Sequence, residues 1–196
     1  MFKLSCVLCY QNKVNTQLRT LCSTCFKKLV PASNYKNFLV SSLYVYEHSM
    51  RELILRVKIA GDHLALNCLK QLWLNTEEGQ KKVMWADCLM PAPSSLWSRV
   101  HGRFDLAYLL CHELSKTNKK KLLHPPKSLY WRWQKRSLLK SRLTMNFDNY
   151  HQQNEKKSHL LIIDDVLTTG YTLNNVAKSL NETYNLRFLT LARASK

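Results

Sequence analysis

Two adjacent acids, Asp164 and Asp165, follow the apolar run LLII and precede a loop rich in threonine. An unbroken apolar run is typical of a central parallel strand, which is covered on both faces. Ligands of open α/β sheets bind at the carboxyl ends of the strands, so the acids are expected at a binding edge. Paired carboxylates there need hydrogen-bond donors or cations, and sugar hydroxyls are suitable donors.

The loop after the acids has the residue types of a phosphate cradle. Backbone N–H groups at a helix start bind anions, threonine hydroxyls add donors, and a glycine permits close approach. The loop therefore offers hydrogen-bond acceptors for the two hydroxyls of a sugar and donors for a phosphate, which matches a ribose 5-phosphate. The alternatives are a metal-binding acidic turn or an ordinary helix N-cap with exposed acids. The candidate ligand-binding residues are Asp164, Asp165, Thr168, Thr169, Gly170, Tyr171 and Thr172.

Four cysteines near the N-terminus have the spacing of a metal site, CxxC followed by twelve residues and a second CxxC. Four thiolates suit a tetrahedral, structural Zn²⁺, and a metal would explain how a segment with few apolar residues folds. A pair of disulfides is the alternative, although a cytoplasmic setting would keep the thiols reduced. The candidate zinc ligands are Cys6, Cys9, Cys22 and Cys25.

The chain is strongly basic. Its 196 residues include 30 Lys or Arg and 13 Asp or Glu, which gives a formal net charge of +17. Such a charge attracts polyanions, with nucleic acid as the first candidate and an acidic membrane surface as the alternative. No apolar run reaches the roughly 18–20 residues of a membrane span, and the N-terminus lacks signal-peptide features. A cytoplasmic protein without a transmembrane segment is therefore expected.

Much of the positive charge lies between Leu114 and Phe147, a segment without acids that includes YWRWQKR at 130–136. Rings among cations are typical of surfaces that bind single strands, because bases stack on the rings while the cations follow the phosphates. The alternative is a strand whose tryptophans pack on the sheet and whose cations form a solvated face. The candidate nucleic-acid contacts are Tyr130, Trp131, Arg132, Trp133, Lys135, Arg136, Lys140 and Arg142.

Strands alternate with helices along the chain, which predicts an α/β fold with a mainly parallel sheet. A cysteine knuckle is predicted at 1–32 and the α/β domain at 33–196. A polar loop is expected at 75–82, and Gly61 is expected to end a helix. The periodicity predicts strands at 41–47, 83–90, 159–163 and 187–192, and helices at 50–58, 63–74, 104–115 and 172–180.

These motifs together resemble the ComF family of competence-associated, type I phosphoribosyltransferase-like proteins, over nearly the whole chain. Leu160–Thr172 is similar, without a gap, to the 13-residue signature of type I phosphoribosyltransferases. LILRVKIAG at 53–61 resembles the family's LIxxLKxxG stretch. MPAPSSLWSRVHGRF at 90–104 resembles its PVP…R…RGFNQ loop, and Gln134 with Arg142 keeps the spacing of a QxxL…R loop.

The chain departs from the family where Asn and Gln of RGFNQ are replaced by Asp105 and Leu106. This change puts the polar contacts of that loop in doubt.

The resemblance implies a type I phosphoribosyltransferase fold with an N-terminal zinc knuckle. It implies that 5-phosphoribosyl 1-diphosphate binds with Mg²⁺, that MPAPSS is the pyrophosphate loop, and that a flexible flap lies at about 120–150. The implied ligand contacts in the pyrophosphate loop are Pro91, Ala92 and Arg99, and the implied catalytic residues are Lys58, Arg103, Asp164 and Asp165.

The resemblance also implies a role in natural transformation, in which the protein handles incoming single-stranded DNA in the cytoplasm. Proteins of the DNA-uptake machinery are then expected partners, and the protein could be peripheral at the inner-membrane uptake site. Two alternatives stay open. One is an active phosphoribosyltransferase that acts on a base, amine or nucleic-acid acceptor. The other is a binding module in which the sugar site senses a metabolite and regulates DNA contact.

Overall fold

The computed structural model describes residues 5–11, 14, 20–32, 40–93, 104–125 and 157–195. The strands in these ranges are β1 (Val40–Val45), β2 (Cys88–Pro91), β3 (Lys121–Leu122), β4 (His159–Leu167) and β5 (Asn185–Arg193). The helices are α1 (Ser23–Lys27), α2 (His48–Ala60), α3 (His63–Leu74), α4 (Glu77–Trp85), α6 (Leu106–Asn118) and α8 (Tyr171–Leu180).

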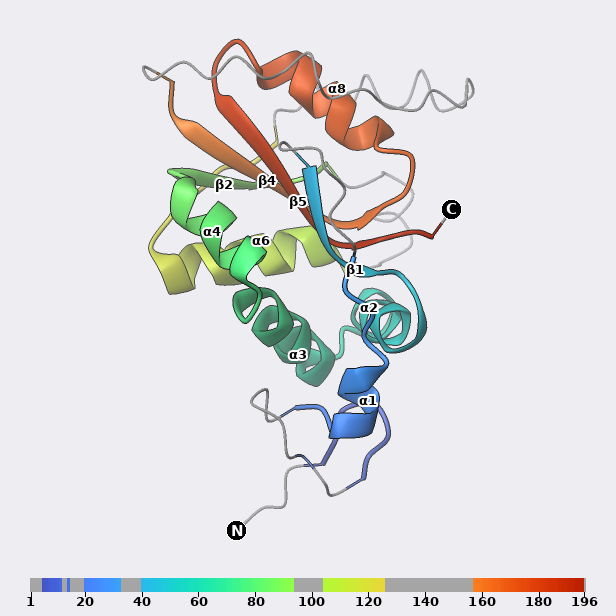
Figure 1. Cartoon of the computed structure of the whole chain (residues 1–196). Coiled ribbons are helices and arrows are strands. Elements are labelled where there is room, and N and C mark those ends of the chain that lie inside the picture. Colours follow the sequence, from blue (N-terminus) through green and yellow to red (C-terminus); the bar gives the residue numbers. More distant parts are fainter. Residues whose placement is uncertain are drawn as a thin grey trace.

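The described strands form one sheet in the order β1-β5-β4-β2-β3, and every pair in it is parallel (Figure 1). The fold is therefore α/β with helices flanking a parallel sheet, as the alternation of elements predicts. β4 lies at the centre of the sheet between β5 and β2. Because strands and crossover helices alternate, the carboxyl ends of the strands share one edge.

Side chains of β4 alternate between the two faces of the sheet. Leu161 and Ile163 belong to the larger core cluster, whereas Leu160 and Ile162 belong to the smaller one. All four are fully buried, which explains why the sequence has an unbroken apolar run here. Helix α8 covers the smaller cluster, on the opposite side of the sheet from α4 and α6 (Figure 1).

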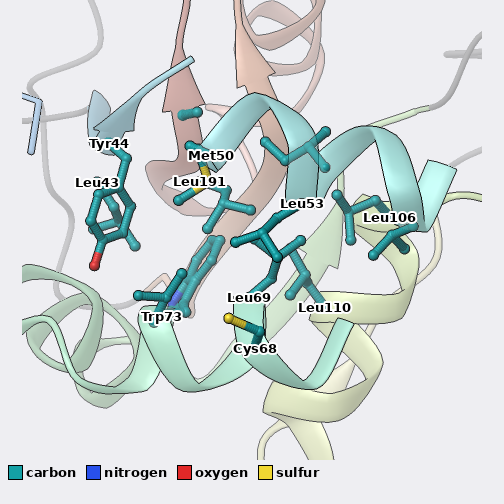
Figure 2. Packing of buried hydrophobic residues seen from close by; sticks show 14 of the residues in the cluster. Leu43, Tyr44, Met50, Leu53, Cys68, Leu69, Trp73, Leu106, Leu110 and Leu191 are labelled. Carbon is teal, nitrogen blue, oxygen red and sulfur yellow. The ribbon is translucent and has the colours of Figure 1, made fainter. Parts of the chain in front are cut away.

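The larger cluster is built where α2, α3 and α6 meet the sheet. Trp73 is its largest fully buried side chain. Leu53 of α2, Leu69 of α3 and Leu110 of α6 gather in the same cluster, and Leu191 of β5 belongs to it (Figure 2). This packing places the last turn of α2 and the first turn of α6 as neighbours, an arrangement that the candidate site uses.

Most of the predicted elements are confirmed. Strands and helices occur at most of the predicted positions, and α3 has the predicted bounds. β4 is longer than predicted, because it continues past residue 163 through Asp164 and Asp165 to Leu167 and stays paired with β5 there. Gly61 ends α2 in the left-handed region, with a φ of 62°. None of the helices in the described ranges is long and apolar enough to cross a membrane.

The prediction for residues 75–90 is wrong in part. The segment predicted as a polar loop contains the start of α4, and the strand expected from residue 83 begins only at Cys88. Thr76 caps α4, since its hydroxyl accepts a hydrogen bond from the backbone of Gly79. Val83 then packs in the larger core cluster, so tertiary burial stabilises a helix that has a weak apolar pattern.

Candidate functional site

The two acids lie where the pairing of β4 with β2 ends. The last paired residues are Pro91 of β2 and Ile163 of β4. The backbone of Ala92 donates one more hydrogen bond to the carbonyl of Ile163, at 2.7 Å. Asp164 follows immediately, so the start of the expected pyrophosphate loop is next to the acids at the carboxyl edge of the sheet.

Lys58, in the last turn of α2, faces this pair. Its Nζ lies 2.6 Å from Oδ2 of Asp165, and the side chains of both residues are largely buried. The structure therefore brings together three of the four expected catalytic residues, Lys58, Asp164 and Asp165. The fourth, Arg103, lies outside the described residues.

Asp164 is in an environment that disfavours its charge. Burial and the neighbouring charge of Asp165 raise the pKa of Asp164 to about 7, against an opposing hydrogen bond from the backbone of Asp165. Lys58 lowers this pKa, and Asp105 raises it further. The site therefore has more carboxylate charge than its lysine balances, and a cation or a set of hydroxyl donors would stabilise it.

The loop after the acids leads into the start of α8. Gly170 occupies the N-cap position with a φ of 72°, in the left-handed region that favours glycine. Gly170 itself has no side chain that could cap this helix. Thr168 and Thr169 are exposed, and the Thr169 hydroxyl accepts a 3.4 Å hydrogen bond from the backbone of Tyr171. A helix start with a glycine N-cap beside threonine hydroxyls has the donors that a phosphate needs.

The position that departs from the ComF pattern has a structural role. Asp105 is the N-cap of α6, and its side chain accepts a hydrogen bond from the backbone of Tyr108 at 3.0 Å. Asp and Asn are equally good N-caps, so this replacement keeps the helix start. It also adds a negative charge that acts on Asp164.

Phe104 ties the start of α6 to the end of α2. Its backbone N–H donates to the carbonyl of Lys58 at 3.2 Å. Its ring lies over Gly61, where an added Cβ would come within 2.4 Å of the ring. The loop that leaves the sheet at Ala92 therefore returns beside Lys58.

Several predicted site residues lie outside the described ranges. They are Arg99 and Arg103, and all eight candidate nucleic-acid contacts, Tyr130, Trp131, Arg132, Trp133, Lys135, Arg136, Lys140 and Arg142. Of the flap expected at about 120–150, residues 120–125 are described, and Lys121 and Leu122 in it form the edge strand β3. The rest of the expected flap lies outside the described residues.

The four N-terminal cysteines lie together. Their sulfur atoms are all within 4.8 Å of one another, and those of Cys9 and Cys22 are 3.6 Å apart. A tetrahedral zinc site with Zn–S bonds of about 2.3 Å requires sulfur atoms about 3.8 Å apart. The Cys22 sulfur also accepts a hydrogen bond from the backbone of Cys25. The donor set and its spacing therefore fit a metal ion such as zinc.

The thiols of this cluster influence one another. Although burial opposes its ionisation, backbone hydrogen bonds from Cys9, Cys22 and Leu8 lower the pKa of Cys6 to about 6. Burial, followed by its sulfur contacts and the charge of Cys6, raises the pKa of Cys25. A bound divalent cation would offset this repulsion between thiolates.

The cysteine segment is attached to α2 by polar contacts. The guanidinium of Arg56 donates to the backbone carbonyl of Val7 and, at 2.7 Å, to the hydroxyl of Tyr10. It also forms an ion pair with Asp62, which caps α3. The hydroxyl of Ser49 donates to the carbonyl of Cys25. The same helix therefore holds the cysteine segment and presents Lys58 to Asp165.

The predictions from the sequence do not include the contact of Arg56 with the cysteine segment, the capping of α6 by Asp105, or the position of the Tyr108 ring near those of His112 and His124. Arg56 lies two residues before Lys58 in an ordinary amphipathic helix, so no local pattern distinguishes it. Asp105 carries the signal of an N-cap, an acid directly before an apolar helical run. The ring contacts of Tyr108 join residues from separate elements, which only the tertiary structure brings together.

No protein-family model matches this chain, and a search of curated proteins finds no significant match. The function is therefore inferred from the residues and their geometry.

Proposed function

We propose that this chain is a ComF-type protein of natural transformation that binds 5-phosphoribosyl 1-diphosphate together with Mg²⁺, and that handles single-stranded DNA. The observation that carries the sugar site is the placement of Asp164 and Asp165. They follow the last residue of the central parallel strand that pairs with β2, and β4 continues beyond them to Leu167, shortly before the start of α8. The fold proposed for the domain is that of the type I phosphoribosyltransferases.

In this proposal the two carboxylates accept hydrogen bonds from the ribose hydroxyls. The 5-phosphate lies on the first turn of α8, where free backbone donors and the helix dipole favour an anion. Gly170 lets the backbone approach the phosphate closely. The diphosphate lies toward Pro91 and Ala92, which border the acids on β2.

The charge balance of the site supports a ligand that carries a cation. Burial first, and then the charge of Asp165, raise the pKa of Asp164, and Lys58 offsets this only in part. Mg²⁺ prefers oxygen ligands and is often held jointly by carboxylates and substrate phosphates. The Mg²⁺ of a magnesium-bound diphosphate would therefore offset the charge of the two acids and also that of the phosphates.

The proposed metal of the cysteine cluster is Zn²⁺, in a structural role. Four thiolates complete a tetrahedral shell and leave no open position for chemistry. The DNA-binding part of the proposal rests on the net charge of +17 and on the basic, aromatic segment at 130–142.

Isothermal titration of the zinc-loaded chain with 5-phosphoribosyl 1-diphosphate and Mg²⁺ tests the sugar site. Saturable binding is expected, and Asp164→Asn with Asp165→Asn should abolish it because both hydroxyl acceptors lose their charge. Thr183→Ala, in the turn after α8, is the matched control and should bind as the original chain does. Normal binding by the double variant would overturn the proposed site.

Pyrophosphate release in the same titration separates binding from turnover. Displacement at C1 of the sugar breaks its bond to the diphosphate and forms a bond to an acceptor. Release that depends on an added base, amine or oligonucleotide would favour the transferase alternative. Binding without release, in the presence of such acceptors, would favour a protein that uses the sugar as a bound effector.

A further inference from the structure

Three aromatic rings lie close to one another at the exposed face of α6. Tyr108 lies with its ring centroid 5.9 Å from that of His112, one turn further along the helix. It lies 6.1 Å from the ring of His124, which follows β3. Both pairs are nearly parallel, with 24° between the ring planes. Lys116 continues the same helix face another turn on, since residues four apart share a face.

These rings are accessible. Tyr108 is 36% exposed, and His124 and Lys116 are exposed. Phe104, just before α6, is 47% exposed although one side of its ring covers Gly61. The opposite face of α6, which includes Leu110 and Cys111, is fully buried. The rings are therefore a surface feature and are not needed to fill the core. We call Phe104, Tyr108, His112, Lys116 and His124 the α6 stripe.

The charge around the α6 stripe is positive. Lys119 and Lys121 are exposed beyond the end of α6. Two acids lie between residues 104 and 125. Asp105 caps the helix, and Glu113 pairs with Lys70 of α3 at 3.0 Å and lies 3.7 Å from Nδ1 of His112. Rings with cations around them are complementary to a polyanion that has exposed bases.

The stripe begins at the candidate sugar site. Phe104 contacts the end of α2 through the carbonyl of Lys58, and Asp105 acts electrostatically on Asp164. From there the helix face runs about 12 Å from Tyr108 to Lys116, at 1.5 Å per residue. A single strand of DNA bound on this face would have one end next to the proposed sugar site.

We propose that the α6 stripe is a stacking surface for single-stranded DNA, which leads from the sugar-phosphate site along α6. This deepens the proposed function and rests on its DNA-binding part. Bases of a single strand stack on Tyr108 and His124, while Lys116 and its neighbours contact the phosphates. Duplex DNA fits this surface poorly, because its bases are already stacked on one another and are not free to cover the rings.

Fluorescence anisotropy of the zinc-loaded chain with a labelled oligothymidine tests the stripe. Tyr108→Ala with His124→Ala should weaken binding more than about tenfold, because tenfold is the loss expected for one stacked base and this variant removes both rings. Tyr108→Phe should bind as the original chain does, because stacking needs only the ring. Lys116→Ala should lower the slope of log affinity against log salt by about 0.7, whereas Tyr108→Ala should leave that slope unchanged.

A control variant and two further measurements distinguish loss of the stacking surface from loss of folding. Met84→Ala removes a side chain that is 77% exposed on α4 and should not change DNA affinity. Circular dichroism checks that each variant is folded, and a photoreactive oligonucleotide should crosslink to the peptide that contains Tyr108 in the unaltered chain. DNA affinity that is unchanged in the folded double variant, or crosslinks that avoid α6, would overturn the stripe.

Titration of the same variants with 5-phosphoribosyl 1-diphosphate separates this proposal from the sugar site. Sugar binding should be unchanged in Tyr108→Ala, since this residue lies outside the phosphate loop. A chain that binds the sugar but binds oligothymidine equally well without the rings refutes only the stripe. If the unaltered chain does not bind oligothymidine, both the stripe and the DNA-binding part of the proposed function are refuted.

Discussion

Asp164 is half-buried on β4, just beyond the last residue that pairs with β2, where two carboxylates and one lysine meet. Burial and the charge of Asp165 raise its pKa to about 7 from an ordinary value of 3.8. The ionised form therefore lowers the stability of the folded state. Sites that must bind a charged ligand often retain such repulsion between like charges, because the bound ligand supplies the compensating charge or hydrogen bonds.

Asp164→Asn should stabilise the fold while it weakens sugar binding. A raised carboxyl pKa means that the folded state binds more protons than the unfolded state, so stability falls as pH rises from about 4 to 7. The free energy of unfolding should increase by about 1–3 kcal/mol at pH 8, a value reduced for the partial exposure of the site. Urea denaturation at pH 8 and pH 5 measures this, and the gain should be smaller at pH 5.

Asp105→Asn is a control that changes the charge near Asp164 without changing Asp164 itself. It keeps the N-cap of α6, because Asn caps as well as Asp. It also removes one of the charges that raise the pKa of Asp164. The apparent pKa of the Asp164 carboxyl, followed by NMR, should fall. A gain for Asp164→Asn that is equal at both pH values, or a pKa that does not move in Asp105→Asn, would contradict this description of the site.

At the scale of secondary-structure elements, the junction between α2 and the start of α6 depends on Gly61 and Phe104. Gly61 ends α2 with a φ of 62°, and its N–H bonds to the carbonyl of Val57. The ring of Phe104 fills the space where a side chain at Gly61 would be. Because Lys58 lies one turn earlier, this junction also sets where its side chain projects.

Gly61→Ala should lower the free energy of unfolding by about 1–3 kcal/mol. A left-handed conformation costs a residue with a Cβ about 1–2 kcal/mol, and displacement of the Phe104 ring adds to this. Chemical denaturation measures the loss. Repeating the substitution in a Phe104→Ala background separates the two causes, because only the conformational part should remain. An equal loss in both backgrounds would mean that the ring contact contributes nothing.

At the scale of the whole molecule, α2 connects the cysteine cluster to the proposed sugar site. Apolar residues of the cysteine segment, among them Val7 and Leu21, belong to the same core cluster as Leu53 of α2. Arg56 adds the polar contacts to Val7 and Tyr10. We therefore expect the cysteine segment to unfold together with the helix that carries Lys58. A metal bound by the cysteines should then influence a site that it does not touch.

Arg56→Ala should lower the free energy of unfolding by about 2 kcal/mol, because a half-buried charged donor loses several partners at once. Removal of metal by a chelator should lower the melting temperature of the whole chain in a single transition. Sugar affinity, measured by calorimetry, should fall in both cases as Lys58 loses its support.

Arg51→Ala is the matched control for this coupling. Arg51 lies on the same helix and is exposed, so its removal should change stability by less than about 0.5 kcal/mol. Two separate melting transitions after chelation, with unchanged sugar affinity, would contradict the coupling and would make the cysteine segment an independent unit.

Features whose cause is local could be predicted from the sequence alone. The unbroken apolar run of β4, the helical periodicity of α3 and the glycine that ends α2 are each found where the sequence predicts them. The cysteines also come together as their spacing predicts. In each case a few neighbouring residues contain the whole signal.

Features whose cause is distant could not be predicted in this way. The start of α4 was predicted as a loop because its sequence is polar, yet Lys82 is buried there and its Nζ donates to the carbonyl of Phe188 on β5. Asp105 was identified only as a departure from a family pattern, whereas its position gives it both a capping role and an influence on Asp164.

The sequence by itself determined the acids, the threonine loop, the cysteine ligands and the alternation of strands and helices. The tertiary structure decided that β1, the first strand, pairs with β5, the last, and that β4 lies between β5 and β2. It also decided that Lys58 meets Asp165 and that His124 meets Tyr108. The physical reason is that backbone conformation and apolar periodicity act between neighbours in sequence, whereas burial and charge act between neighbours in space.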